Sequence, residues 1–262
     1  MSLPPVEIPL GAMRFNSDSQ KLEYFNGYEW MQIHTFNPDL NGGARGIYAG
    51  GNAPGGKSDV IEYINISSSG NGVDFGDMVS ARGGPGGCGS RTRGIIAGGG
   101  EPSRVDKIDY ITIASTGNAT DFGNLTQSRS QDGNNGGNSA TRGLFAAGTT
   151  PSLVNTIDYV TIAQTGNAVD FGDLVNEKST LASVSSSTRG IIQYGAISPS
   201  PEATLDYITM ASTGNASSFG TLDGSNGLYA GGSSSTRGLF AGGYITNIIQ
   251  YITTIVWVFF EF

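Results

Sequence analysis

Short apolar runs alternate with stretches of Gly, Ser, Thr and Asn along most of this chain, at a nearly constant interval. The clearest landmark is an Arg-Gly step that leads into an apolar burst, and its arginines are Arg45, Arg93, Arg142, Arg189 and Arg237. These arginines are 48, 49, 47 and 48 residues apart. A period of this size predicts an array of one repeated supersecondary unit. The sequence therefore indicates five copies of one module.

Two further landmarks recur in each of the first four modules. Segments rich in Ile, Val, Tyr and Thr, which favour a half-buried strand, cover 61–66, 108–113, 157–162 and 205–210. A Gly-Asn step then supplies a reversal of the chain, and Asp-Phe-Gly or Ser-Phe-Gly follows at 74–76, 121–123, 170–172 and 218–220. No stretch keeps a 3.6-residue hydrophobic period. We therefore expect almost no helix.

About 48 residues accommodate four short strands with their turns, which is one blade of a β-propeller. The burst at 238–243 has no polar alternation, as expected for a strand that is buried on both faces. The order of landmarks resembles the kelch repeat: an apolar burst, Gly-Gly, Tyr, an aromatic residue, and then a basic residue at Arg82, Arg129 or Lys178. Phe replaces the kelch Trp, and the third module has Ala147-Gly148 for Gly-Gly. The resemblance, over 44 to about 253, implies an all-β, five-bladed propeller and leaves function open.

Three parts are expected along the chain: an N-terminal tail at 1–12, a β-hairpin segment at 13–43, and a propeller at 44–262. The propeller blades would start near 44, 92, 141, 188 and 236. Asn26-Gly27 between aromatic-rich flanks is a strong hairpin signal. The fifth module has only 27 residues, so we expect the hairpin segment to complete the last blade and remove its exposed edge. The alternative is a hairpin that docks elsewhere or drives trimerisation.

The segment 11–30 contains Arg-Phe-Asn and then Tyr-Phe-Asn-Gly-Tyr-Glu-Trp. It resembles a small hairpin common in structural proteins of tailed bacteriophages, and the repeat array resembles structural proteins of marine phages, including cyanophages. This double resemblance implies a virion protein that acts as a fibre, whisker or decoration module. It implies other virion proteins and a host-surface glycan as partners. Loops near 52–58, 100–106, 149–156 and 195–204 differ between modules and would carry this recognition.

Charge and composition bear on which classes of partner are expected. The net charge is −8 without a basic run, which excludes a nucleic-acid partner. The C-terminal run 245–262 is too polar and too short for membrane insertion. Its apolar end, 255–262, is expected to be a final core strand, or otherwise a contact in a homo-oligomer.

Catalytic chemistry is not indicated. His34 is the only histidine and Cys88 the only cysteine, so neither a histidine-based triad nor a cysteine metal cage can form, and Cys88 is expected to be a buried thiol. We expect no catalytic, cofactor-binding or metal-ligating residue and no enzyme. The repeated Asp-Phe-Gly-Asp is interpreted as turns rather than calcium ligands. Each of the repeated Arg-Gly arginines is expected to bond carbonyls or an acidic neighbour at the same place in its blade rather than to form part of a ligand ring. The rival functions are a kelch-type protein-interaction adaptor and, less favoured, a carbohydrate-active propeller enzyme.

Overall fold

The structure of the protein, a computed structural model, describes residues 8–16, 21–32, 45–131, 137–179, 182–193, 203–223, 229–234, 237–242 and 248–253. Within these ranges every regular element is a β-strand, and all strand pairs are antiparallel. The predicted all-β class, almost without helix, is confirmed. The chain divides into two compact units, Met1–Leu40 and Asn41–Phe262.

The first unit is a small antiparallel sheet of three strands, β1 (Met13–Asn16), β2 (Lys21–Phe25) and β3 (Trp30–Gln32). The predicted hairpin at Asn26-Gly27 is confirmed, because β2 and β3 pair on either side of it. The Asn26 side-chain oxygen accepts hydrogen bonds from the Tyr28 and Glu29 amides, at 2.9 and 2.8 Å, and Gly27 has a φ of +97°. A side-chain cap and a left-handed glycine are what a tight reversal requires. The completion of the last blade by residues 13–43 stays a prediction.

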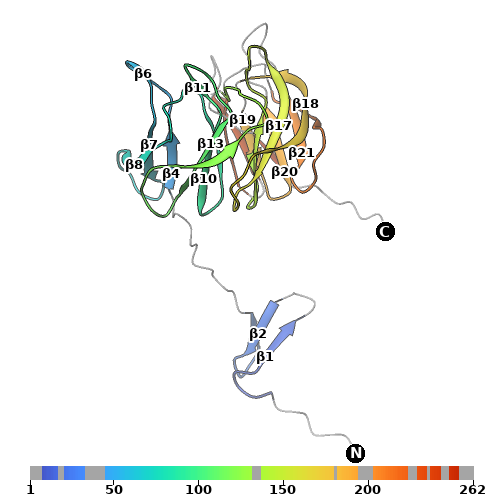
Figure 1. Ribbon diagram of the computed structural model, residues 1–262. Helices are drawn as coiled ribbons and strands as arrows, with labels where there is room; N and C mark the ends of the chain where they lie inside the picture. The colour runs from blue at the N-terminus through green and yellow to red at the C-terminus, as the bar shows by residue number, and fades with distance from the viewer. Residues whose placement is uncertain are drawn as a thin grey trace, which may run out of the picture. The chain divides into compact units, whose positions relative to one another are not determined.

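The second unit contains five successive sheets (Figure 1). The first consists of β4 (Arg45–Ala49), β7 (Val60–Asn65) and β8 (Val73–Asp77). The second consists of β9 (Gly86–Gly89), β10 (Arg93–Ala97), β13 (Lys107–Thr112) and β14 (Thr120–Asn124). The third consists of β15 (Gly137–Asn138), β16 (Arg142–Ala146), β17 (Val154–Thr161) and β18 (Val169–Lys178). The fourth consists of β19 (Ala182–Ser185), β20 (Arg189–Gln193), β21 (Thr204–Thr209) and β22 (Ser217–Thr221). The fifth consists of β23 (Tyr229–Ser233), β24 (Arg237–Gly242) and β25 (Ile249–Thr253).

The three sequence landmarks occupy fixed places in these sheets. In the four-stranded sheets, the Arg-Gly burst forms the second strand, the Ile- and Tyr-rich segment the third, and the Phe-Gly segment the fourth. The interpretation of Asp-Phe-Gly-Asp as turns is therefore wrong: these residues lie within β8, β14 and β18, where the Phe side chains are buried. In the second to fifth sheets, a first strand of small residues precedes the Arg-Gly step and pairs with it. These sheets therefore begin one strand upstream of the Arg-Gly positions.

Two short hairpins extend the connection between the second and third strands. They are β5 (Asn52–Ala53) with β6 (Gly56–Lys57), and β11 (Gly100–Glu101) with β12 (Ser103–Arg104). Figure 1 shows β6 and β11 at the same end of their sheets.

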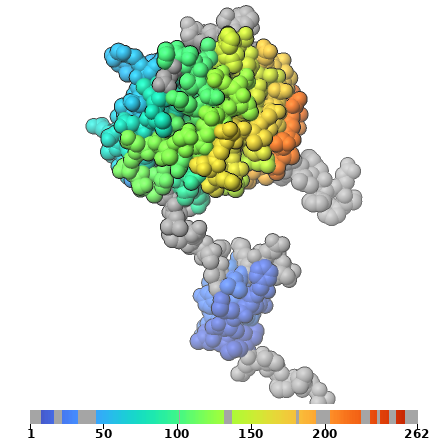
Figure 2. All heavy atoms as spheres, in the orientation of Figure 1, coloured from blue at the N-terminus to red at the C-terminus, as the bar shows by residue number. Residues whose placement is uncertain are grey.

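The core lies between consecutive sheets. Phe122 of the second sheet packs in one cluster with Phe145 and Val160 of the third, and Leu144 of the third packs with Ile192 and Ile208 of the fourth. The other two clusters join the first sheet to the second and the fourth to the fifth. Figure 2 shows the same order on the surface, with colour passing from blue through green and yellow to orange across the second unit. Each sheet is therefore stabilised by its neighbours in the sequence, as in repeat proteins.

Candidate functional site

Buried ion pairs join consecutive sheets. The Arg82 guanidinium contacts the Asp109 carboxylate at 2.5 Å, and Arg129 contacts Asp158 at 3.1 Å, with all four side chains at most 1% exposed. Burial raises the pKa of Asp109, and the charge of Arg82 opposes this shift. Burial likewise lowers the pKa of Arg129, and Asp158 opposes it. Two of the three basic positions that resemble the kelch pattern are thus committed to contacts between sheets.

The arginines of the Arg-Gly steps are also held by the scaffold. The guanidinium groups of Arg45, Arg93 and Arg142 donate to backbone carbonyls 68 or 69 residues further along, those of Ile113, Ile162 and Met210, at 2.6, 3.1 and 2.8 Å. Each also lies over a tyrosine ring of its own sheet, 4.5–4.9 Å from the ring centroid. The expected carbonyl bonds are confirmed for these three, although the carbonyl belongs to the segment that follows the third strand of the next sheet.

The Gly-Asn turn of one module docks on the Phe-Gly strand of the preceding module. The Gly117 amide donates to the Phe75 carbonyl at 2.7 Å, and the Asn118 side chain accepts from the Asp77 amide at 3.1 Å. The same contacts recur between the next two pairs of sheets. No group of three or more His, Cys, Asp or Glu side chains that could hold a metal occurs in the described part of the chain.

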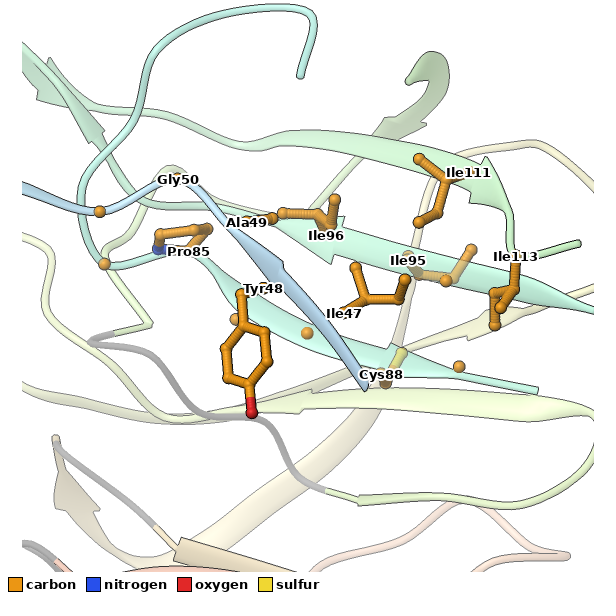
Figure 3. Close-up of a pocket in the computed structure, with 16 residues that line it drawn as sticks. Ile47, Tyr48, Ala49, Gly50, Pro85, Cys88, Ile95, Ile96, Ile111 and Ile113 are labelled. Carbon is orange, nitrogen blue, oxygen red and sulfur yellow. The ribbon is translucent and has the colours of Figure 1, made fainter. Parts of the chain in front are cut away.

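An apolar cavity of about 610 Å³ lies between the first two sheets, where Ile47 of β4 lies beside Ile95 of β10 (Figure 3). At two other boundaries between sheets the corresponding space is filled by a side chain. A Cβ on Gly143 would meet the Cys88 sulfur, and a Cβ on Gly238 would meet Val184. Both contacts come from the first strand of the preceding sheet. Among the described residues, the first sheet begins with β4 and has no such strand. The cavity is thus the space beside an edge of β4.

Cys88 borders this cavity from β9 (Figure 3). The residue as a whole is half-buried, but its sulfur faces Gly143 of the third sheet. Burial raises the pKa of this thiol well above its ordinary value. This agrees with the expected buried thiol and gives the residue a packing role.

A second, polar hollow of about 570 Å³ lies at the end of the sheets that carries the two short hairpins. Its floor and walls are formed by Asn52, Lys57, Gly83, Gly84, Gly100, Pro102, Ser103, Arg104 and Ser130. Lys57 and Arg104 come from the β5–β6 and β11–β12 hairpins of adjoining sheets, and both are exposed. The hollow therefore presents two cations, hydroxyls and an amide to solvent.

The sequence located the loops of this hollow, near 52–58 and 100–106, but not the individual side chains that meet there. Lys57 and Arg104 are 47 residues apart, and no motif marks them. The one available signal was that these loops differ between modules. His34 and most of the loop near 195–204 lie outside the described residues, as does the apolar end 255–262.

Comparisons with known proteins leave the chain without an assigned family. No protein-family model matches it, and no curated protein matches it at a significant level. None of the described residues forms a helix long and apolar enough to cross a membrane.

Proposed function

We propose that the second unit is a five-bladed β-propeller in which each sheet is one blade. Support comes from the first strands: β9 contacts β15 and β16, β15 contacts β19 and β20, and β19 contacts β23 and β24. First strands that follow one another in this way are typical of the innermost strands around a propeller axis. The first and fifth sheets have three described strands each, which fits a ring that is closed by the segments near the two ends.

The function that we propose is that of a structural protein of a tailed-phage particle, a fibre, whisker or decoration module. The observation that carries this proposal is that repeated and variable residues have different places in the modules. Repeated side chains, such as Arg93 and Asp109, contact neighbouring sheets, whereas two of the connections that vary between modules, near 52–58 and 100–106, line the polar hollow. A constant scaffold with variable loops at one end is typical of a protein that displays a recognition surface. The sequence resemblance to phage structural proteins supplies the context of the virion.

Other virion proteins and a host-surface glycan are the proposed partners of this surface. A kelch-type adaptor that binds one soluble protein would use the same scaffold and is the main rival. Neither proposal involves catalysis.

Purified phage particles provide the test. An antibody against the second unit should label the particles at one defined location, and the protein should remain with the particles through density-gradient purification. If the protein is released from the particles during purification and instead captures one soluble cellular protein, the adaptor function is favoured. A reconstruction of the particle at the labelled location should show five radial sheets, and a linear stack would contradict the propeller.

A further inference from the structure

We propose that the polar hollow at the β5–β6 and β11–β12 hairpins binds a carboxylate-bearing sugar, such as a uronic acid unit of a polysaccharide. The inference rests on the proposed function, because it takes this end of the sheets as the recognition face. It goes further by naming a site and the chemical class of its ligand.

Two cations face the hollow in a chain whose net charge is −8. Arg104 carries a planar guanidinium that can bind a carboxylate through two parallel hydrogen bonds. Lys57 adds a second positive charge from the neighbouring hairpin. Because the rest of the protein is acidic, an anionic ligand is favoured at this place over most of the surface.

Lys57 is held in position by the Asn52 side chain and fits against Gly83. Its ammonium group donates to the Asn52 side-chain oxygen at 2.5 Å, and an ammonium has three donors. Beneath this pair lies Gly83, where a Cβ would stand 2.7 Å from both the Lys57 nitrogen and the Asn52 oxygen. Only a residue without a side chain allows Lys57 and Asn52 to lie where they do.

Pairs of backbone hydrogen bonds hold the floor of the hollow, which favours a rigid floor. The Gly83 and Gly100 amides donate to one another's carbonyls, at 3.0 and 2.8 Å, so the segment after β8 is bridged to β11. Ser130 is bridged in the same way to Thr149, which lies between β16 and β17. A rigid floor loses little conformational freedom when a ligand binds, which favours affinity.

The remaining groups favour a sugar over a bare anion. Ser103, Ser130 and Asn52 offer hydroxyl and amide groups, which suit the hydroxyls of a sugar ring. The volume of about 570 Å³ falls in the range of small-molecule sites and far exceeds the needs of one phosphate ion.

Binding of the full chain to polygalacturonate and to neutral dextran, measured by calorimetry, tests the proposal. We expect binding to polygalacturonate only, and a loss of about tenfold or more in affinity for Lys57→Gln and for Arg104→Gln. Gly83→Ala should also weaken binding, because the new methyl group would displace Lys57; circular dichroism of this variant checks its fold. Arg91→Gln is the matched control, since it removes one positive charge from the turn between β9 and β10, at the opposite end of β10 from Gly100, and should bind like the parent.

Several outcomes would overturn the proposal. They are equal binding to dextran, equal weakening by Arg91→Gln, no binding to polygalacturonate, or displacement of the sugar by millimolar inorganic phosphate, which would indicate a simple anion site. The virion test separates this proposal from the proposed function. If the protein is found on particles but does not bind polygalacturonate, the proposed ligand alone is refuted. If the protein binds polygalacturonate through Lys57 but is absent from particles, the virion role alone is refuted.

Discussion

Arg129, in the connection after β14, lies 3.1 Å from Asp158 of the third sheet, with both side chains fully buried. The Asp158 carboxylate also accepts hydrogen bonds from the Thr126 amide and hydroxyl, at 3.0 and 2.6 Å. The carboxylate thus joins the third sheet to this connection through three groups. Arg82 and Asp109 repeat this arrangement one module earlier. The sheets are therefore held together by polar contacts as well as by their apolar faces.

Replacement of Asp158 by Ala should destabilise the protein strongly. The change leaves the Arg129 charge buried without its partner, and breaking a buried pair in this way costs about 3–5 kcal/mol. Chemical denaturation of the purified variant measures the loss. Asp121→Ala, at an exposed position of β14, is the control and should change stability by less than about 0.5 kcal/mol. An unchanged midpoint for Asp158→Ala would mean that the pair does not form.

Replacement of Arg93 by Ala tests the scaffold role of the Arg-Gly arginines. It removes the bond to the Ile162 carbonyl and the stacking on Tyr110, so we expect a loss of about 1–3 kcal/mol in unfolding free energy. Ligand binding at the polar hollow should keep its affinity. If Arg93→Ala abolished binding of a glycan or a protein without lowering the melting temperature, the arginines would be ligand contacts instead.

Replacement of Gly143 by Ala should be destabilising, and the reason can be tested with a second variant. The new methyl group would meet the Cys88 sulfur, and overpacking of this kind costs about 1–3 kcal/mol. Cys88→Ala should restore part of the stability of Gly143→Ala. Thermal unfolding of the two single variants and the double variant gives the coupling energy, and strictly additive effects would contradict the contact.

Replacement of Ala147 by Gly should be neutral or stabilising. Ala147 has a φ of +56°, and its counterpart in the second module, Gly98, has a φ of +65°. A left-handed backbone costs a non-glycine residue about 1 kcal/mol, and the glycine variant avoids this cost. The gain offsets the stability that glycine loses because it is more flexible in the unfolded chain. Gly98→Ala should have the opposite effect, because its Cβ would stand 2.6 Å from the Arg129 carbonyl oxygen. Melting temperatures that shift the other way would refute this assignment.

The Cys88 thiol should react slowly in the folded protein. Burial raises its pKa, so the neutral thiol is favoured and little nucleophilic thiolate is present. Its contribution to stability is complete below the unfolded pKa of about 8.5 and decreases as the pH rises above that value. Alkylation by iodoacetamide at pH 8 should be slow in buffer and fast in denaturant. Equal rates in both would show that the thiol is accessible.

The period, the all-β class and two of the four strands in a full module could be predicted from the sequence, because each of these depends on local properties. Strand-forming residues at 108–113 and the Asn26-Gly27 turn carry their signals within a few residues. The Asp-Phe-Gly segments were misread as turns, because their Gly and Asp are typical of turns and their strand state depends on pairing with the third strand. The first strands, such as Gly86–Gly89, carry no such signal. They are strands because they pair with the Arg-Gly strand and pack closely against the next sheet.

Which distant residues meet depends on how the sheets pack. Arg82 with Asp109, and Lys57 with Arg104 around one hollow, come from different modules. Their encounter depends on how one sheet packs on the next. A repeat period fixes what each module contains, but the offset between neighbouring modules arises from the fit of buried side chains, which no local pattern encodes.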